Sequence, residues 1–81
     1  MTEFKNMVGV QLRITFENDV ITYLKKDELS IPFNHRIVKV EKYILYSTLN
    51  TDIYYWESVN FEVDRLNCIR EKPRLSLYRN V

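Results

Sequence analysis

Residues 8–16 read VGVQLRITF, and apolar residues alternate strictly with others along this stretch. One side of an extended chain would carry Val8, Val10, Leu12, Ile14 and Phe16. Successive side chains of a strand point to opposite faces, so the pattern predicts a strand with one buried face. Gly9 falls inside this predicted strand, where a glycine is typical of a bulge or a close backbone approach.

A turn and a returning strand are predicted next. END at 17–19 has turn chemistry, because Asn and Asp tolerate left-handed dihedral angles, and VITYLK at 20–25 returns as the second arm of a hairpin. A two-residue loop would place Phe16 opposite Ile21, and a three-residue loop would place it opposite Val20. The sequence leaves both registers open.

The middle of the chain predicts a turn, an irregular piece and a long strand. KKDE at 25–28 is a polar turn, and Pro32 makes LSIPFNH at 29–35 a loop or an edge strand. RIVKVEKYILYSTL at 36–49 alternates again and is rich in residues that favour strands. Its apolar face would hold Val38, Val40, Ile44 and Tyr46, with Lys42 interrupting it.

The following stretch, NTDIYYWESVNFEV at 50–63, predicts the partner strand. A two-residue loop at Asn50-Thr51 would pair Tyr46 with Tyr55 and Lys39 with Glu62, which joins apolar to apolar and positive to negative side chains. A core role then follows for Ile53, Tyr55, Val59, Phe61 and Val63. The opposite face carries four large side chains, Tyr43, Leu45, Tyr54 and Trp56.

After Val63 the pattern is ambiguous. DRLNCIRE at 64–71 fits a short helix that begins at Asp64, with Leu66 and Ile69 facing inward, and fits a strand equally well. A turn at Lys72-Pro73 and a last strand over 75–78 follow. We therefore expect one all-β domain over residues 1–81, or an α+β domain if 64–71 is helical. Five to six short antiparallel strands would form a small barrel or a strongly bent sheet.

Composition supports this fold class. The 81 residues are 46% hydrophobic and 14% aromatic, and they include no alanine, the best helix former. A single cysteine excludes an internal disulfide, and no apolar run is long enough to cross a bilayer as a helix. We expect a cytoplasmic protein without a signal peptide. The excess of Asn, Lys, Ile and Tyr fits an AT-rich genome, such as that of a phage or mobile element.

The sequence contains few residues suited to catalysis or metal binding. His35 and Cys68 are the single histidine and cysteine, too few for a structural zinc site, and their positions do not favour a nucleophilic pair. No glycine-rich phosphate loop or calcium loop is present. The sequence therefore predicts a protein that is not an enzyme and that has no cofactor and no metal.

The function class that remains is recognition of a partner molecule by the protein surface. Tyr43, Leu45, Tyr54 and Trp56 form a candidate protein-binding patch, since exposed aromatic side chains are typical of interface hot spots. We expect a small adaptor or inhibitor, of phage or mobile-element origin, that acts on a host protein complex. Homodimerisation through this face or through an unprotected strand edge is a related expectation.

The alternative is a small barrel that binds nucleic acid. The formal net charge is +1, but residues 65–81 carry five basic side chains against one acidic side chain. Stacking of bases on aromatic rings and phosphate contacts would then use this segment. The candidate residues, for nucleic acid or for an acidic partner, are Arg70, Lys72, Arg74, Tyr78 and Arg79.

Overall fold

The structure, a computed structural model, describes residues 3–31 and 34–73, and all regular structure in these ranges is β-strand. The all-β prediction is therefore confirmed for these residues. The eight strands are β1 (Phe4–Asn6), β2 (Leu12–Phe16), β3 (Ile21–Leu24), β4 (Leu29–Ser30), β5 (Ile37–Ser47), β6 (Asp52–Ser58), β7 (Phe61–Val63) and β8 (Cys68–Glu71).

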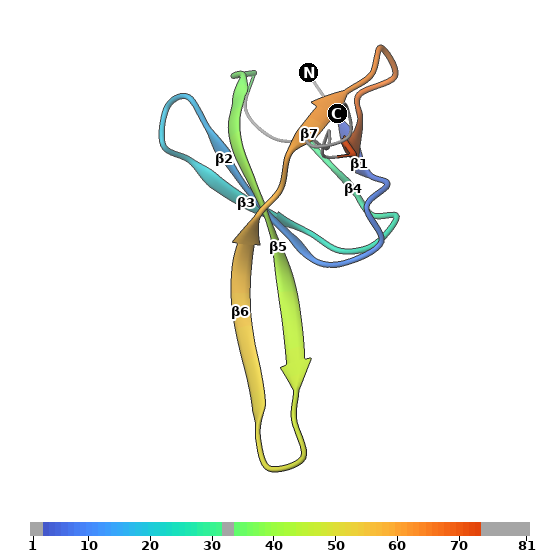
Figure 1. Cartoon of the computed structure of the whole chain (residues 1–81). Helices are drawn as coiled ribbons and strands as arrows, with labels where there is room; N and C mark the ends of the chain where they lie inside the picture. Colours follow the sequence, from blue (N-terminus) through green and yellow to red (C-terminus); the bar gives the residue numbers. More distant parts are fainter. Residues whose placement is uncertain (1–2, 32–33, 74–81) are drawn as a thin grey trace, which may run out of the picture.

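The strands form two four-stranded sheets rather than a barrel (Figure 1). The strand order is β4-β1-β8-β7 in one sheet and β3-β2-β5-β6 in the other. Neighbours are antiparallel except β1 and β8, which run parallel with Lys5 opposite Cys68 and Asn6 opposite Ile69. The expected five or six antiparallel strands were thus too few, and one pairing has the opposite direction.

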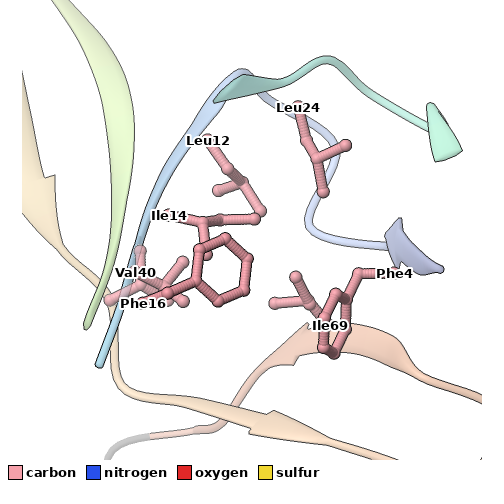
Figure 2. Close-up of a cluster of buried hydrophobic side chains, with 8 residues drawn as sticks. Phe4, Leu12, Ile14, Phe16, Leu24, Val40 and Ile69 are labelled. Carbon is pink, nitrogen blue, oxygen red and sulfur yellow. The ribbon is translucent and has the colours of Figure 1, made fainter. Parts of the chain in front are cut away.

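The hydrophobic core lies where side chains from both sheets meet (Figure 2). The alternation in 12–16 gives this core Leu12, Ile14 and Phe16, all of which are buried. From the other sheet, Phe4 packs its ring 6.1 Å from that of Phe16. The full set of buried apolar residues is Phe4, Leu12, Ile14, Phe16, Leu24, Val40, Val59 and Ile69.

One polar side chain, Asn6, is fully buried beside this core. Its Nδ2 donates to the carbonyl oxygens of Val10 (2.7 Å) and Lys25 (3.0 Å), and its Oδ1 accepts from the N–H of Val8 (2.8 Å). A buried amide is tolerated only when it is hydrogen-bonded, and this one joins three separate pieces of backbone. Asn6 therefore fixes how β1 sits against the 8–10 segment and the end of β3.

The first hairpin takes the three-residue register. Ile14 lies opposite Thr22, and the N–H of Phe16 donates to the carbonyl of Val20 (2.9 Å). Asp19 adopts a φ of 69°, which is the left-handed residue that a three-residue loop requires. The two-residue alternative at Asn18-Asp19 is therefore wrong.

The predicted strand over 8–16 begins later than expected. Residues 8–10 form bends, and β2 starts at Leu12. Gly9 lies in these bends rather than in a strand, and its φ of 98° is readily available only to glycine. Val8 and Val10 still pack partly buried against the core, so the apolar alternation was correct for burial although not for strand length.

The segment 64–71 is a turn followed by β8, so the helix alternative is wrong. The Oδ1 of Asp64 accepts from the N–H groups of both Leu66 (2.9 Å) and Cys68 (3.0 Å), and Asn67 has a positive φ of 62°. These bonds stabilise a turn, whereas the prediction of a helix required Asp64 to cap the first turn of a helix. Ile69 is buried as predicted, whereas Leu66 is exposed.

Two predictions lie outside the described residues: the last strand over 75–78 and the effect of Pro32. Leu29–Ser30 does form an edge strand, β4, as the neighbouring proline suggested. Within the described ranges, helices of a length and apolarity suited to crossing a membrane are absent.

Candidate protein-binding site on an aromatic hairpin arm

The hairpin of β5 and β6 extends away from the rest of the molecule (Figure 1). Strand β2 accompanies β5 as far as Lys42, and the N–H of Tyr43 makes a last bond to the carbonyl of Gln11 (3.0 Å). Beyond that point β5 pairs only with β6, within the described residues. We call residues 43–56 the arm.

The register of the arm differs from the prediction by two residues. Tyr43 lies opposite Trp56 and Tyr46 lies opposite Ile53, so the turn lies at Leu49-Asn50, one residue earlier than the predicted Asn50-Thr51. Thr48 closes this turn, because its N–H donates to Thr51 O (2.8 Å) and its Oγ1 accepts from the N–H of Thr51 (3.0 Å). Pairing Tyr46 with Tyr55 was therefore wrong, but a shift of two leaves every side chain on its predicted face.

The arm is apolar on both faces. Of its fourteen residues nine are Ile, Leu, Tyr or Trp, and one, Asp52, is charged. Leu45 and Tyr54 are about half exposed (51% and 55%), and Leu49 at the tip is fully exposed. A contiguous apolar surface of this kind is unusual on a monomeric soluble protein and marks contact sites.

On one face of the arm the rings contact one another. The centroids of Tyr43 and Trp56 lie 4.9 Å apart, and those of Tyr43 and Tyr54 lie 5.5 Å apart in a nearly parallel stack. Tyr23 from β3 adds a ring 5.9 Å from Trp56. The aromatic patch comprises Tyr23, Tyr43, Leu45, Tyr54 and Trp56.

The aromatic patch is held in place from the body side by Arg13. Its guanidinium lies 4.5 Å from the ring centre of Trp56 and donates to both carboxylate oxygens of Glu41, at 2.8 and 3.0 Å. The two hydrogen bonds from Arg13 lower the pKa of Glu41 despite its burial, and the same pairing raises the pKa of Arg13. A stacked, fully ionised arginine thus links the sheet to the base of the aromatic patch.

The opposite face of the arm is a continuation of the core-facing side of β5, but within residues 3–31 and 34–73 its side chains do not join the buried core. It carries Ile44, Tyr46, Ile53 and Tyr55, and three of these are exposed by 43% or more. The expected core role of Ile53 and Tyr55 is therefore wrong, because the second sheet ends before the arm. Val59 is buried and Phe61 partly buried, as predicted, whereas Val63 is at the border of exposure.

Val38 does not lie on the apolar face that the sequence predicted for it, and it is half exposed. The register between β2 and β5 shifts there, with Thr15 opposite Lys39 and Phe16 opposite Ile37. Such a bulge turns the neighbouring residue inward, and Ile37 packs against the core. Lys42, which interrupts the apolar face, stays in register directly opposite Glu57, and its ammonium group bonds Glu71 at 3.1 Å.

The basic residues do not join the aromatic patch. Arg70 lies on β8 in the other sheet and pairs with Asp64 (3.0 Å), and Lys72 follows that strand. Arg74, Tyr78 and Arg79 lie outside the described residues. Arg13 lies against Trp56 and is paired with Glu41, and the exposed Lys39 shares that carboxylate at 3.6 Å, so the cations beside the stacked rings are Arg13 and Lys39, not the predicted basic residues of the C-terminal segment.

A cleft of about 490 Å³ lies between the ends of β6 and β8. It is lined by Glu57, Ser58, Asn60, Glu71, Lys72 and Pro73. The N–H of Lys72 donates to the carbonyl of Asn60 (2.6 Å), which joins two of the lining residues. The described residues that line this cleft do not include a member of the aromatic patch.

The remaining candidate groups do not form a reactive site. His35 lies 3.4 Å from the carboxylate of Glu17, and the Arg36 N–H and His35 lower the pKa of that carboxylate. Cys68 is partly buried on β8, in the other sheet. Among residues 3–31 and 34–73, His, Cys, Asp and Glu side chains do not gather in threes suited to a metal ion.

Sequence reasoning missed two members of this site, Arg13 and Tyr23. Both lie on the outward-facing positions of the first hairpin, and the structure pairs them directly with each other. The alternation in 8–16 already placed Arg13 opposite the core. Its nearness to Trp56 depends on the pairing of β2 with β5, which no local pattern specifies.

Comparison of the chain with known protein families, with curated proteins and with solved structures found no match.

Proposed function

We propose that this chain is a non-enzymatic protein-binding module that contacts its partner through the aromatic patch. The observation that carries the proposal is a set of rings in mutual contact, at 4.9 to 5.9 Å, at the base of a projecting arm, of which Tyr23 and Tyr54 are about half exposed. Tyr and Trp supply large contact area with few rotatable bonds, which makes them frequent hot-spot residues. In its finer form, the proposal is a phage or mobile-element adaptor or inhibitor that acts on a host protein complex.

Pre-organisation supports the same proposal. Trp56 is held between Arg13, Tyr23 and Tyr43, so its ring is ordered before any partner arrives. Ordering a side chain costs about 0.5–1.5 kcal/mol on binding, and a ring that is already fixed avoids that loss. Tyr54 and Leu45, further along the arm, are more exposed and would supply the contact area.

The test is affinity capture compared across matched variants. Leu45→Ser with Tyr54→Ser removes the exposed half of the patch, and Tyr46→Ser removes a comparably exposed residue from the opposite face. We expect a defined set of captured proteins that is lost with the double variant and kept with Tyr46→Ser. Capture that is identical for all three proteins contradicts the proposal, provided that circular dichroism shows the same β-structure in each.

Binding to nucleic acid is the competing function, and a salt titration with a Lys72→Glu variant addresses it. A nucleic acid that stacks its bases on Tyr54 and contacts basic side chains through its phosphates would bind at low salt. Its affinity would fall steeply as the salt concentration rises, because phosphate contacts release counterions. We expect no anisotropy change for labelled single-stranded DNA or RNA at low ionic strength. Binding that falls with salt and is lost in Lys72→Glu would replace the protein-binding proposal.

A further inference from the structure

We propose that β6 forms the contact between two copies of this chain, joined edge to edge about a two-fold axis at Tyr55. The feature behind the proposal is the outer edge of the arm. Strand β6 is the last strand of its sheet, and within residues 3–31 and 34–73 no strand pairs with its second edge. Unprotected edges of this kind are templates for pairing with another chain.

The hydrogen-bond pattern shows which residues face that edge. Val59 N donates to Val40 O, and Thr48 N donates to Thr51 O, each at 2.8 Å and in the register of the hairpin. Antiparallel pairs alternate, so the odd-numbered residues of β6 bond β5. The even-numbered residues, Asp52, Tyr54, Trp56 and Ser58, direct their N–H and C=O groups to the free edge.

The edge lacks most of the usual protection against pairing. Over seven residues β6 contains no proline and no lysine, and its register with β5 shows no bulge. Its two charged side chains, Asp52 and Glu57, lie near its ends and leave the centre of the strand uncharged. Natural edge strands are commonly blunted by prolines, lysines or bulges, so the centre of this edge is suited to a partner strand.

The sequence of β6 is complementary to itself. An axis through Tyr55 pairs all seven residues, with Tyr54 opposite the Trp56 of the second copy and Tyr55 opposite itself. Both of the resulting aromatic pairs belong to classes that stabilise antiparallel sheets. Asp52 meets Ser58 and Ile53 meets Glu57 of the second copy, and no two like charges are directly opposed. The alternation also fits, because Tyr54 and Trp56 are both edge-facing residues.

The ends of the two strands would meet the cleft in this register. With Asp52 opposite Ser58, the loop 48–51 of each copy would lie near the cleft beside Lys72 and Pro73 of the other. Lys72 is exposed there and would face Asp52, while Glu71 in the same cleft is paired with Lys42. Leu49, which is fully exposed in the single chain, would lie near the cleft of the second copy.

The need for a second copy follows from the arm itself. A two-stranded hairpin is at best marginally stable in water, and three or more strands with an apolar face are needed for independent stability. Joining two arms converts each two-stranded ribbon into a four-stranded one. It also places the aromatic patches of the two copies side by side, because a two-fold axis normal to the sheet preserves its faces.

Cysteine cross-linking tests the axis directly. A non-hydrogen-bonded pair has Cα atoms about 4.5 Å apart, within the range of a disulfide. We expect Tyr55→Cys, in a Cys68→Ala background, to give a disulfide-linked dimer under mild oxidation at micromolar concentration. Ile53→Cys in the same background is the matched control, since its copies would lie four residues apart across the axis, and we expect it to cross-link at least tenfold more slowly.

Solution mass provides the second measurement. The unmodified chain should show twice its single-chain mass at high concentration, with Lys72→Glu shifting the midpoint about fivefold upward. A single-chain mass at every concentration up to about 1 mM, or equal cross-linking at positions 53 and 55, overturns the proposal. The proposal does not rest on the protein-binding function: loss of capture in Leu45→Ser alone, whose side chain lies on β5 and outside the β6 contact, with intact dimers separates the two.

Discussion

Arg13 and Glu41 lie directly opposite each other on β2 and β5, and two hydrogen bonds of 2.8 and 3.0 Å join them. Trp56 stacks on the same guanidinium. The pair sits where the body of the molecule becomes the arm. An electrostatic contact in the sheet thereby fixes the first ring of an exposed aromatic surface.

Acid should weaken this contact. Arg13 lowers the pKa of Glu41 below its ordinary value of 4.5. A lowered folded-state pKa means that the pair stabilises the fold above the unfolded pKa, and that this stabilisation is lost as pH falls through the folded value. We expect the free energy of unfolding to decline below about pH 4.5, measured by urea unfolding at a series of pH values.

Glu41→Gln is the control for that prediction. It should be less stable than the wild type at pH 7, and the difference should shrink as the pH falls toward 3. Other carboxylates with lowered pKa values, Glu17 and Asp64, remain in the variant and keep part of the pH dependence. A difference that stays constant from pH 7 to pH 3 contradicts the assigned role of the Arg13 pair.

Asn6 should be among the most sensitive positions of the fold. Asn6→Ala leaves the carbonyls of Val10 and Lys25 and the N–H of Val8 without their partner. Unsatisfied buried groups cost about 1–3 kcal/mol each, so we expect a loss of about 3 kcal/mol in unfolding free energy. Asn50→Ala, in the exposed loop of the arm, is the control and should change stability by less than about 0.5 kcal/mol.

The arm and the core should respond differently to the loss of apolar side chains. Ile14→Ala removes a fully buried side chain between the sheets and should cost about 3 kcal/mol. Leu45→Ala, half exposed on the arm, should cost under about 1 kcal/mol because much of its surface is already in water. Chemical unfolding of the two variants under conditions that favour the single chain measures both, and equal losses would mean that the arm belongs to the core.

The first hairpin offers a pair of glycine substitutions with opposite signs. Asp19 has a φ of 69°, which is costly for residues with a side chain, so Asp19→Gly should raise stability by about 0.5 kcal/mol. Asn18→Gly should lower it, because the Oδ1 of Asn18 accepts from the N–H of Val20. Thermal unfolding of both variants tests the three-residue loop, and a stabilised Asn18→Gly would argue against it.

The sequence predicted the strand face on which each side chain lies better than it predicted which residues pair across neighbouring strands. Leu12, Ile14 and Phe16 are buried because a period of two is a local property of the strand. The same period kept Tyr43 and Trp56 on one face although the turn between them lies one residue earlier than expected. Thr48 sets that turn through its own hydrogen bonds, a detail that apolar pairing alone cannot reveal.

The parts that sequence reasoning missed depend on distant residues. Strand β1 is only three residues long, and its parallel pairing joins Lys5 to Cys68 across most of the chain. The exposure of Tyr55 likewise depends on where the second sheet ends, not on the residues around it. Of the candidate site, the four arm residues were predicted, and Arg13 and Tyr23 required the sheet order.

The central claim is that the arm is a contact surface with an open edge. Amide hydrogen exchange of Tyr54 and Trp56, compared at low and high protein concentration, tests it most directly, because both N–H groups face that edge. We predict rapid exchange at low micromolar concentration and slow exchange near 1 mM, with Tyr55, whose N–H faces β5, less affected. Protection of Tyr54 and Trp56 that is the same at both concentrations would contradict the account.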